Sequence, residues 1–149
     1  MNATETKDAV AAILTQAQVS FAVTYSGETT RPDSGKGWKR DAWNVRIASG
    51  KAFLETSYYT GLGLRSKAKN RFLQDRPQKP AAADVLHSLT LDAQANDMSF
   101  QDWCGDFGYS DDSIEAFDTY RACCKIATQL RAVFKPETLA DIRAALQDY

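Results

Sequence analysis

The chain has 149 residues, of which 44% are hydrophobic and 25% are charged, as in an ordinary soluble protein. This length predicts one domain with a sizeable core, and no apolar run approaches the roughly 20 residues that a membrane helix needs. The first residues lack the basic and apolar regions of a secretion signal, so we expect a cytoplasmic protein that contacts no membrane.

The net charge of −1 conceals a strong asymmetry along the chain. Residues 1–30 carry one Lys against three acidic residues, a net charge of −2. Residues 31–79 carry twelve Lys and Arg against four Asp and Glu, a net charge of +8. Residues 80–149 carry five against twelve, a net charge of −7. Such asymmetry between segments indicates a charged partner, either acidic or basic.

The first third of the chain predicts a helix followed by a strand. Residues 5–18 favour a short helix or a mobile leader with one apolar side. Residues 19–25 then alternate between apolar and polar side chains, which is the period of a half-buried strand. Residues 26–37 are rich in Gly and small polar residues, so we expect a long loop there.

Two further strands complete an antiparallel meander over residues 19–59. Trp43, Val45 and Ile47 alternate with polar residues in the second strand, and residues 52–59 form the third. Between them, Ser49-Gly50 is a plausible two-residue hairpin turn because Gly accepts the positive φ that such a turn needs.

The rest of the chain predicts a basic linker and then a helical part. Residues 60–80 lose regular periodicity and carry many Lys and Arg, which favours a linker. A helix over residues 81–95 follows, in a helical part that covers residues 81–149, and Pro136 opens the last helix.

Residues 98–134 organise the helical part as a short capped helix, a Gly-Tyr turn and one long amphipathic helix. Ser99 is expected to cap the short helix with Asp102 three residues later, and Met98 and Trp103 stand at the positions of a hydrophobic staple. Asp112 and Glu115 repeat the cap signal at the start of the long helix.

The long helix shows one apolar stripe with spacings of three and four residues, which predicts a single buried face. The stripe consists of Ile114, Phe117, Tyr120, Cys124, Ala127, Leu130 and Phe134. We expect a core that joins this helix and the short one to sheet residues such as Trp43 and Val45; its helical members are Trp103, Phe107, Phe117, Tyr120, Leu130 and Phe134. The fold class is therefore α+β: a three-stranded antiparallel sheet followed by about four helices packed on one face, in one domain over residues 1–149.

No set of residues for catalysis or metal binding emerges from the sequence. The Gly61-Leu62-Gly63 turn completes neither a P-loop nor a dinucleotide fingerprint, and His87 is the only histidine. Three cysteines give neither a disulfide framework nor a zinc site, so buried or half-buried helix thiols are favoured over a reactive thiol. We therefore predict a protein that is not an enzyme and that has no cofactor and no metal.

Two surfaces are candidates for binding a partner. Carboxylates crowd residues 97–118 with no Lys or Arg between them, which fits either a solvated face or an acidic patch for a basic protein partner. The partner-binding candidates are Asp106, Asp111, Glu115 and Asp118. The alternative is nucleic-acid binding by basic residues interleaved with aromatic ones, since these track phosphates and stack bases. Its candidates are Lys36, Trp38, Lys39, Arg40, Arg65, Lys67, Lys69 and Arg71.

The sequence also resembles a known group of proteins. The blocks WKRDAWNVRI, YYTGLG, DVLHSLTLDA and DMSFQDWCGDFGYSDDS, with TYRAC, are similar to a family of small proteins encoded by phages and prophages. The resemblance implies a viral accessory protein in the cytoplasm of the host cell. Our leading hypothesis is a non-enzymatic, anti-CRISPR-like inhibitor that binds a host defence complex by charge complementarity. The alternative is a phage accessory protein that binds nucleic acid through residues 36–71.

Overall fold

The computed structural model describes residues 2–30, 39–60 and 79–149. Helix α1 (Ala3–Gln16) comes first, and Asn2 caps it by accepting a hydrogen bond from the Glu5 N–H at 2.8 Å. The helix buries Val10 and Leu14 against the rest of the molecule, because these residues stand four positions apart on one face. The helix expected over residues 5–18 is therefore confirmed, although it both begins and ends two residues earlier, at Ala3 and Gln16.

A three-stranded antiparallel sheet follows, in the order β1-β2-β3. Its strands are β1 (Ser20–Thr30), β2 (Lys39–Ser49) and β3 (Ala52–Thr60), as the meander predicts. The loop expected from residue 26 was wrong in part, because β1 continues to Thr30. The register shifts between Tyr25 and Gly27, and Gly27 has φ of +109°, so a bulge at a glycine lets the strand continue. The remainder of the predicted loop, residues 31–37, lies outside the described residues.

The β2–β3 hairpin turns one residue later than the sequence suggested. Ser49 pairs with Ala52, so the two turn residues are Gly50 and Lys51. Gly50 has φ of +59°, which a residue without a Cβ adopts at no steric cost. One face of the sheet buries Val45 and Ile47, and this face turns toward the helices.

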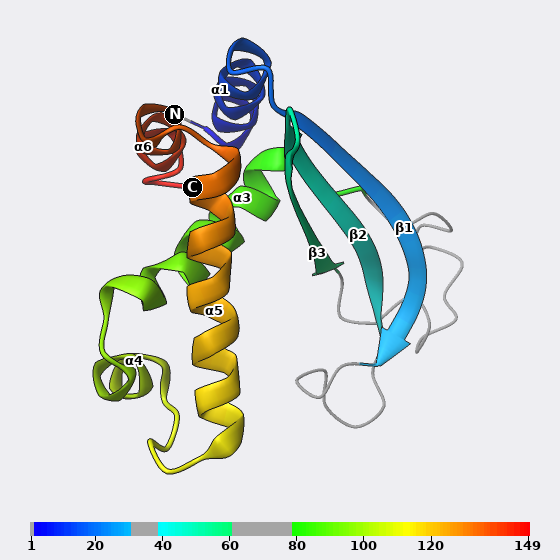
Figure 1. Cartoon of the computed structure of the whole chain (residues 1–149). Helices are drawn as coiled ribbons and strands as arrows, with labels where there is room; N and C mark the ends of the chain where they lie inside the picture. The colour runs from blue at the N-terminus through cyan, green and yellow to red at the C-terminus, as the bar shows by residue number, and fades with distance from the viewer. Residues whose placement is uncertain (1, 31–38, 61–78) are drawn as a thin grey trace.

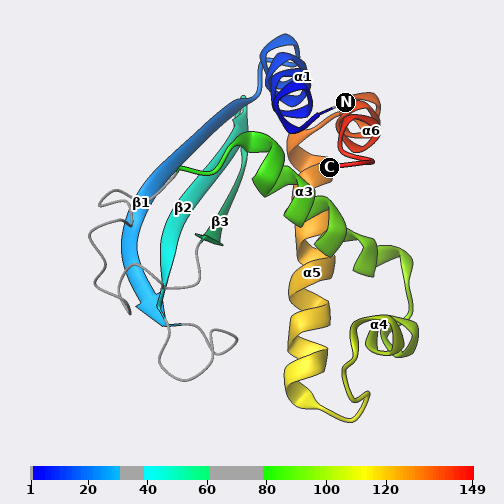
Figure 2. The same ribbon diagram turned by 180° about the vertical axis from the view of Figure 1, so that it is seen from behind.

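The helical part lies on the concave side of the curved sheet (Figures 1 and 2). Its elements are α3 (Ala82–Ala93), the 3₁₀ helix η2 (Gln94–Asp97), α4 (Phe100–Phe107), α5 (Ile114–Val133) and α6 (Pro136–Ala145). With α1, the described ranges hold five α-helices, and the α+β class with helices on one face of the sheet is confirmed. None of these helices is long and apolar enough to cross a membrane in the parts of the chain described. Most of the predicted linker, residues 61–78, is outside those parts.

The main core lies between the sheet and helices α1, α3, α5 and α6. Helix α5 contributes only its C-terminal half to this core. The largest fully buried side chains of the core are Ile47, Leu54, Leu86, Leu130, Ile142, Val10, Val45 and Val85. Of the expected α5 members, Leu130 and the following Phe134 are buried here, as the apolar stripe predicts.

A second, smaller core joins α4 to the N-terminal half of α5, away from the sheet. It consists of Ala95, Trp103, Cys104 and Ala116, with partly buried neighbours that include Tyr120. The prediction that Trp103 joins the sheet in one core was therefore wrong, and so was the burial of Phe107 and Phe117, which remain 49% and 44% exposed. The physical reason is that α5 extends past the main core, where α4 covers one side of it (Figure 1).

The C-terminal residue is attached to the start of the helical part. The Asp84 carboxylate accepts the Ala81 N–H at 2.9 Å through one oxygen and the Tyr149 hydroxyl through the other. The Tyr149 ring also lies edge-on to His87, with ring centroids 5.6 Å apart. Burial and the hydrogen bond to Asp84 raise the pKa of Tyr149 to about 12. This contact fixes the last turn of the chain against α3.

Candidate protein-binding surface

Residues 97–118, called the acidic lobe below, are held by local hydrogen bonds that the sequence anticipates. Ser99 caps α4, because its Oγ accepts the Asp102 N–H at 3.1 Å. Met98 packs against the cluster that contains Trp103, as a hydrophobic staple requires. Gly108 ends α4 in the left-handed region at φ of +77°, which positions Tyr109 after the turn.

The cap of α5 differs from the prediction by one residue. Ser113, not Asp112, is the N-cap, and its Oγ accepts the Ala116 N–H at 3.2 Å. The Asp112 carboxylate instead accepts the Ser110 hydroxyl within the preceding turn. The two residues are neighbours with similar capping preference, so the pattern alone did not distinguish them.

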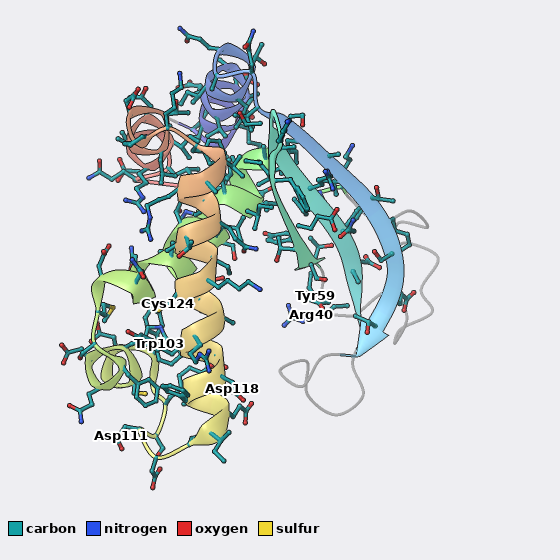
Figure 3. The ribbon with its side chains drawn as sticks, in the orientation of Figure 1. Arg40, Tyr59, Trp103, Asp111, Asp118 and Cys124 are labelled. Carbon is teal, nitrogen blue, oxygen red and sulfur yellow. The ribbon has the colours of Figure 1, made fainter. Side chains whose placement is uncertain are left out.

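The buried Trp103 side chain is the centre of the acidic lobe (Figure 3). Tyr109 stacks on its indole with centroids 4.9 Å apart and an interplanar angle of 12°. Tyr120 approaches the indole edge-on at 5.6 Å, and its hydroxyl donates to the Met98 carbonyl at 2.6 Å. Because these contacts join α4, the turn after it and α5, they fix the relative position of all three.

All four predicted partner-binding carboxylates are exposed at this end of the molecule. Asp106 lies on α4 and Asp111 on the turn, while Glu115 and Asp118 lie on α5. Figure 3 shows Asp111 at the tip of the lobe and Asp118 on the side of α5 away from α4. Among the described residues, no three potential ligands come close enough to hold a metal ion. The carboxylates thus form a spread of negative charge: residues 80–120 hold no Lys or Arg, and the first cation after them is Arg121, whose guanidinium lies 5.8 Å from the Phe117 ring.

The same surface exposes four apolar side chains, of which the sequence analysis assigned Phe107, Ile114 and Phe117 to a buried face. Ile114 is 81% exposed, and Phe107, Tyr109 and Phe117 are each more than two-fifths exposed. Phe117 contacts the rest of the lobe edge-on through Phe100, at 5.3 Å between centroids. One signal in the sequence could have identified Ile114: it follows the cap residues at the start of the helix, and side chains lean toward the helix N-terminus, so no earlier turn of α5 covers it.

The alternative basic surface falls mostly outside the described residues. Lys36, Trp38, Arg65, Lys67, Lys69 and Arg71 lie there, whereas Lys39 and Arg40 begin β2. The Nε of Arg40 is buried and has no hydrogen-bond partner in the part of the chain that the structure describes. Trp43 is 5% exposed, and its Nε1 donates to the Thr60 hydroxyl at 2.8 Å. This ring is therefore part of the folded interior and is not free to stack on a base.

The three thiols are free, and they are buried or half-buried as the sequence favoured. Burial, with the Asp92 carboxylate nearby, raises the pKa of Cys123 to about 11, and burial also raises the pKa of Cys104. Both thiols therefore stay protonated at neutral pH, whereas nucleophilic or metal-binding cysteines are thiolates. Comparisons of the chain with protein-family models, with curated proteins and with solved structures give no match.

Proposed function

We propose that the protein is a phage-encoded, non-enzymatic inhibitor of a host defence complex, anti-CRISPR-like, that binds a basic protein surface through the acidic lobe. The observation that carries the proposal is the composition of that surface. Its four candidate carboxylates, Asp106, Asp111, Glu115 and Asp118, are exposed at the same end of the molecule as four exposed apolar side chains of residues 107–117. The resemblance of the sequence to phage-encoded proteins supplies the biological setting.

The charge of the acidic lobe favours a protein over a nucleic acid as its partner. Phosphate backbones and anionic membrane surfaces are negative, so a surface with seven carboxylates against the neighbouring Arg121 repels them. A basic protein surface is attracted over several ångströms instead, which speeds association and selects the partner. A protein that handles nucleic acid needs a basic surface to bind phosphates, and covering that surface inhibits the protein without any chemical step.

The test combines Asp106→Asn with Asp118→Asn and measures phage plating on cells that carry a defence system. Both side chains are exposed, so the melting curve should be unchanged. We expect partial loss of inhibition, which deepens when Glu115→Gln is added. The matched control is Asp141→Asn with Asp148→Asn, two exposed carboxylates at the α6 end of the chain.

Full inhibition by the Asp106/Asp118 variant, or equal loss in the Asp141/Asp148 control, would overturn the assignment to this surface. Capture of the partner from host lysate with and without nuclease separates the two classes of partner. A partner retained after nuclease treatment supports direct protein binding. Loss of every retained component after nuclease treatment would favour the nucleic-acid alternative.

A further inference from the structure

The exposed apolar side chains of the acidic lobe are a feature that folding does not explain. The described residues include seven exposed large hydrophobic side chains, and four of them fall within residues 107–117. Single exposed hydrophobic residues are ordinary, but a group rimmed by charged residues marks an interaction site. Ile114 is the extreme case at 81% exposure, so its side chain contributes little to the stability of the fold.

The four side chains are linked through the aromatic rings of the lobe. Phe107 and Tyr109 both contact Trp103, with centroids 5.5 and 4.9 Å from the indole. Trp103 lies 6.5 Å from Phe100, which in turn contacts Phe117. Ile114 stands one helical turn from Phe117 on α5, so it extends the same apolar surface toward the tip of the lobe.

The charges next to this apolar surface indicate which kind of partner it can bind. Ile114 and Asp118 stand four residues apart on α5, so an apolar and an acidic side chain lie next to each other on one face of that helix. A complementary partner must present apolar and cationic side chains side by side, about one helical turn apart. An amphipathic helix with Leu or Ile on one stripe and Lys or Arg beside it has this pattern.

We propose that the acidic lobe binds a basic amphipathic helix of a partner protein, with Ile114 and Phe117 contacting the apolar stripe of that helix. This inference rests on the proposed function for its biological setting, but it concerns the chemistry of the partner alone. In such an interface a few central apolar residues supply most of the binding energy, while the surrounding charges set the association rate. Ile114 therefore governs the dissociation rate, and Asp118 with Glu115 governs the rate of association and its dependence on salt.

The probe is a fluorescent synthetic peptide of about five helical turns, built from Leu and Lys in an amphipathic pattern, with a Leu/Glu peptide as its counterpart. We expect the full chain to bind the Leu/Lys peptide and not the Leu/Glu peptide. Ile114→Ser should weaken binding about tenfold through faster dissociation, as a central apolar contact does. The matched control is Leu91→Ser, which removes a side chain of 45% exposure on α3, outside the lobe.

Equal affinities of wild type and Ile114→Ser, or equal losses in Ile114→Ser and Leu91→Ser, would overturn the inference. Absence of Leu/Lys peptide binding by the wild-type chain would overturn it as well. The outcome is separable from that of the proposed function. A chain that binds the peptide through Ile114 but fails to protect phage in plating supports this inference and refutes the inhibitor. If the Ile114→Ser variant protects phage as well as wild type and binds the peptide as tightly, the inhibitor proposal is supported and this inference is refuted.

Discussion

Replacement of Trp103 by Ala tests whether the acidic lobe has a core of its own. Trp103 is 3% exposed, and the only other fully buried residues of its cluster are Ala95, Cys104 and Ala116. A buried Trp removes about 150–250 Å² from water, so at about 25 cal/mol per Å² its truncation removes roughly 4–6 kcal/mol. Measured truncations of this kind fall at about 3–5 kcal/mol. We take about 4 kcal/mol as the expected cost.

Because the lobe is packed separately from the sheet, the loss of stability should let the lobe open locally while the main core stays folded. A loss of about 4 kcal/mol raises the open population of the lobe about a thousandfold, at 1.4 kcal/mol for each factor of ten. Amide hydrogen exchange should therefore accelerate by about that factor in α4, while β2 amides near Val45 keep their protection. Loss of the near-ultraviolet circular dichroism of the aromatic group should accompany it.

The matched control is Phe117→Ala, since Phe117 is also an aromatic residue of the lobe but is 44% exposed. Its cost should be about half that of Trp103→Ala, roughly 2 kcal/mol, because 44% of its surface stays in water in the folded chain. The reasoning is refuted if Trp103→Ala accelerates exchange equally in α4 and β2, which would make the two cores one unit. It is also refuted if the two variants are equally destabilised.

Two further predictions concern the contact of Tyr149 with Asp84 and the N-cap of α5. Tyr149→Phe removes the hydrogen bond to Asp84 and should cost roughly 1–2 kcal/mol at neutral pH, measured by urea unfolding. Since the pKa of Tyr149 is raised from 10.0 to about 12, the hydroxyl contributes its full stability below pH 10 and loses it as the pH rises to about 12. Wild type and variant should therefore converge over that interval, and a constant difference would contradict the assignment. Ser113→Ala should cost about 1 kcal/mol through the lost cap of α5, whereas Asp112→Ala should cost less, and the opposite order in urea midpoints would restore Asp112 as the cap.

The fold was predictable wherever a short sequence pattern is compatible with a single local structure. The alternation of β2 and the capping of α4 by Ser99 involve residues close in sequence, and both predictions are confirmed. The extent of β1 was not predictable in the same way. Gly27 reads as a loop signal in the sequence, but in the structure it accommodates a bulge within a strand that is already paired with β2. Pairing with β2 determines where β1 ends, and the sequence of β1 alone does not show which residues it pairs with.

The candidate site likewise has features that the sequence predicts and features that it does not. Exposure of Asp106, Asp111, Glu115 and Asp118 was expected, because carboxylates stay in water unless they are paired. Exposure of Phe117 was not expected, because the helical period identifies an apolar face without naming what covers it. In the structure the C-terminal half of α5 meets the sheet, whereas the N-terminal half packs on α4 and η2 among the described elements.

Because the two halves of α5 pack separately, variants can distinguish residues that contact the partner from residues that only hold the binding surface in place. Ile114 is exposed and Trp103 is buried beneath the same surface, so one should affect binding without stability and the other should affect both. If Ile114→Ser lowers affinity while α4 keeps its exchange protection, the side chain itself contacts the partner. If only Trp103→Ala lowers affinity, the partner recognises the placement of the carboxylates, because the main core keeps α5 folded while α4 and its charges are released. The two variants together therefore distinguish an apolar anchor from a purely electrostatic surface on the same lobe.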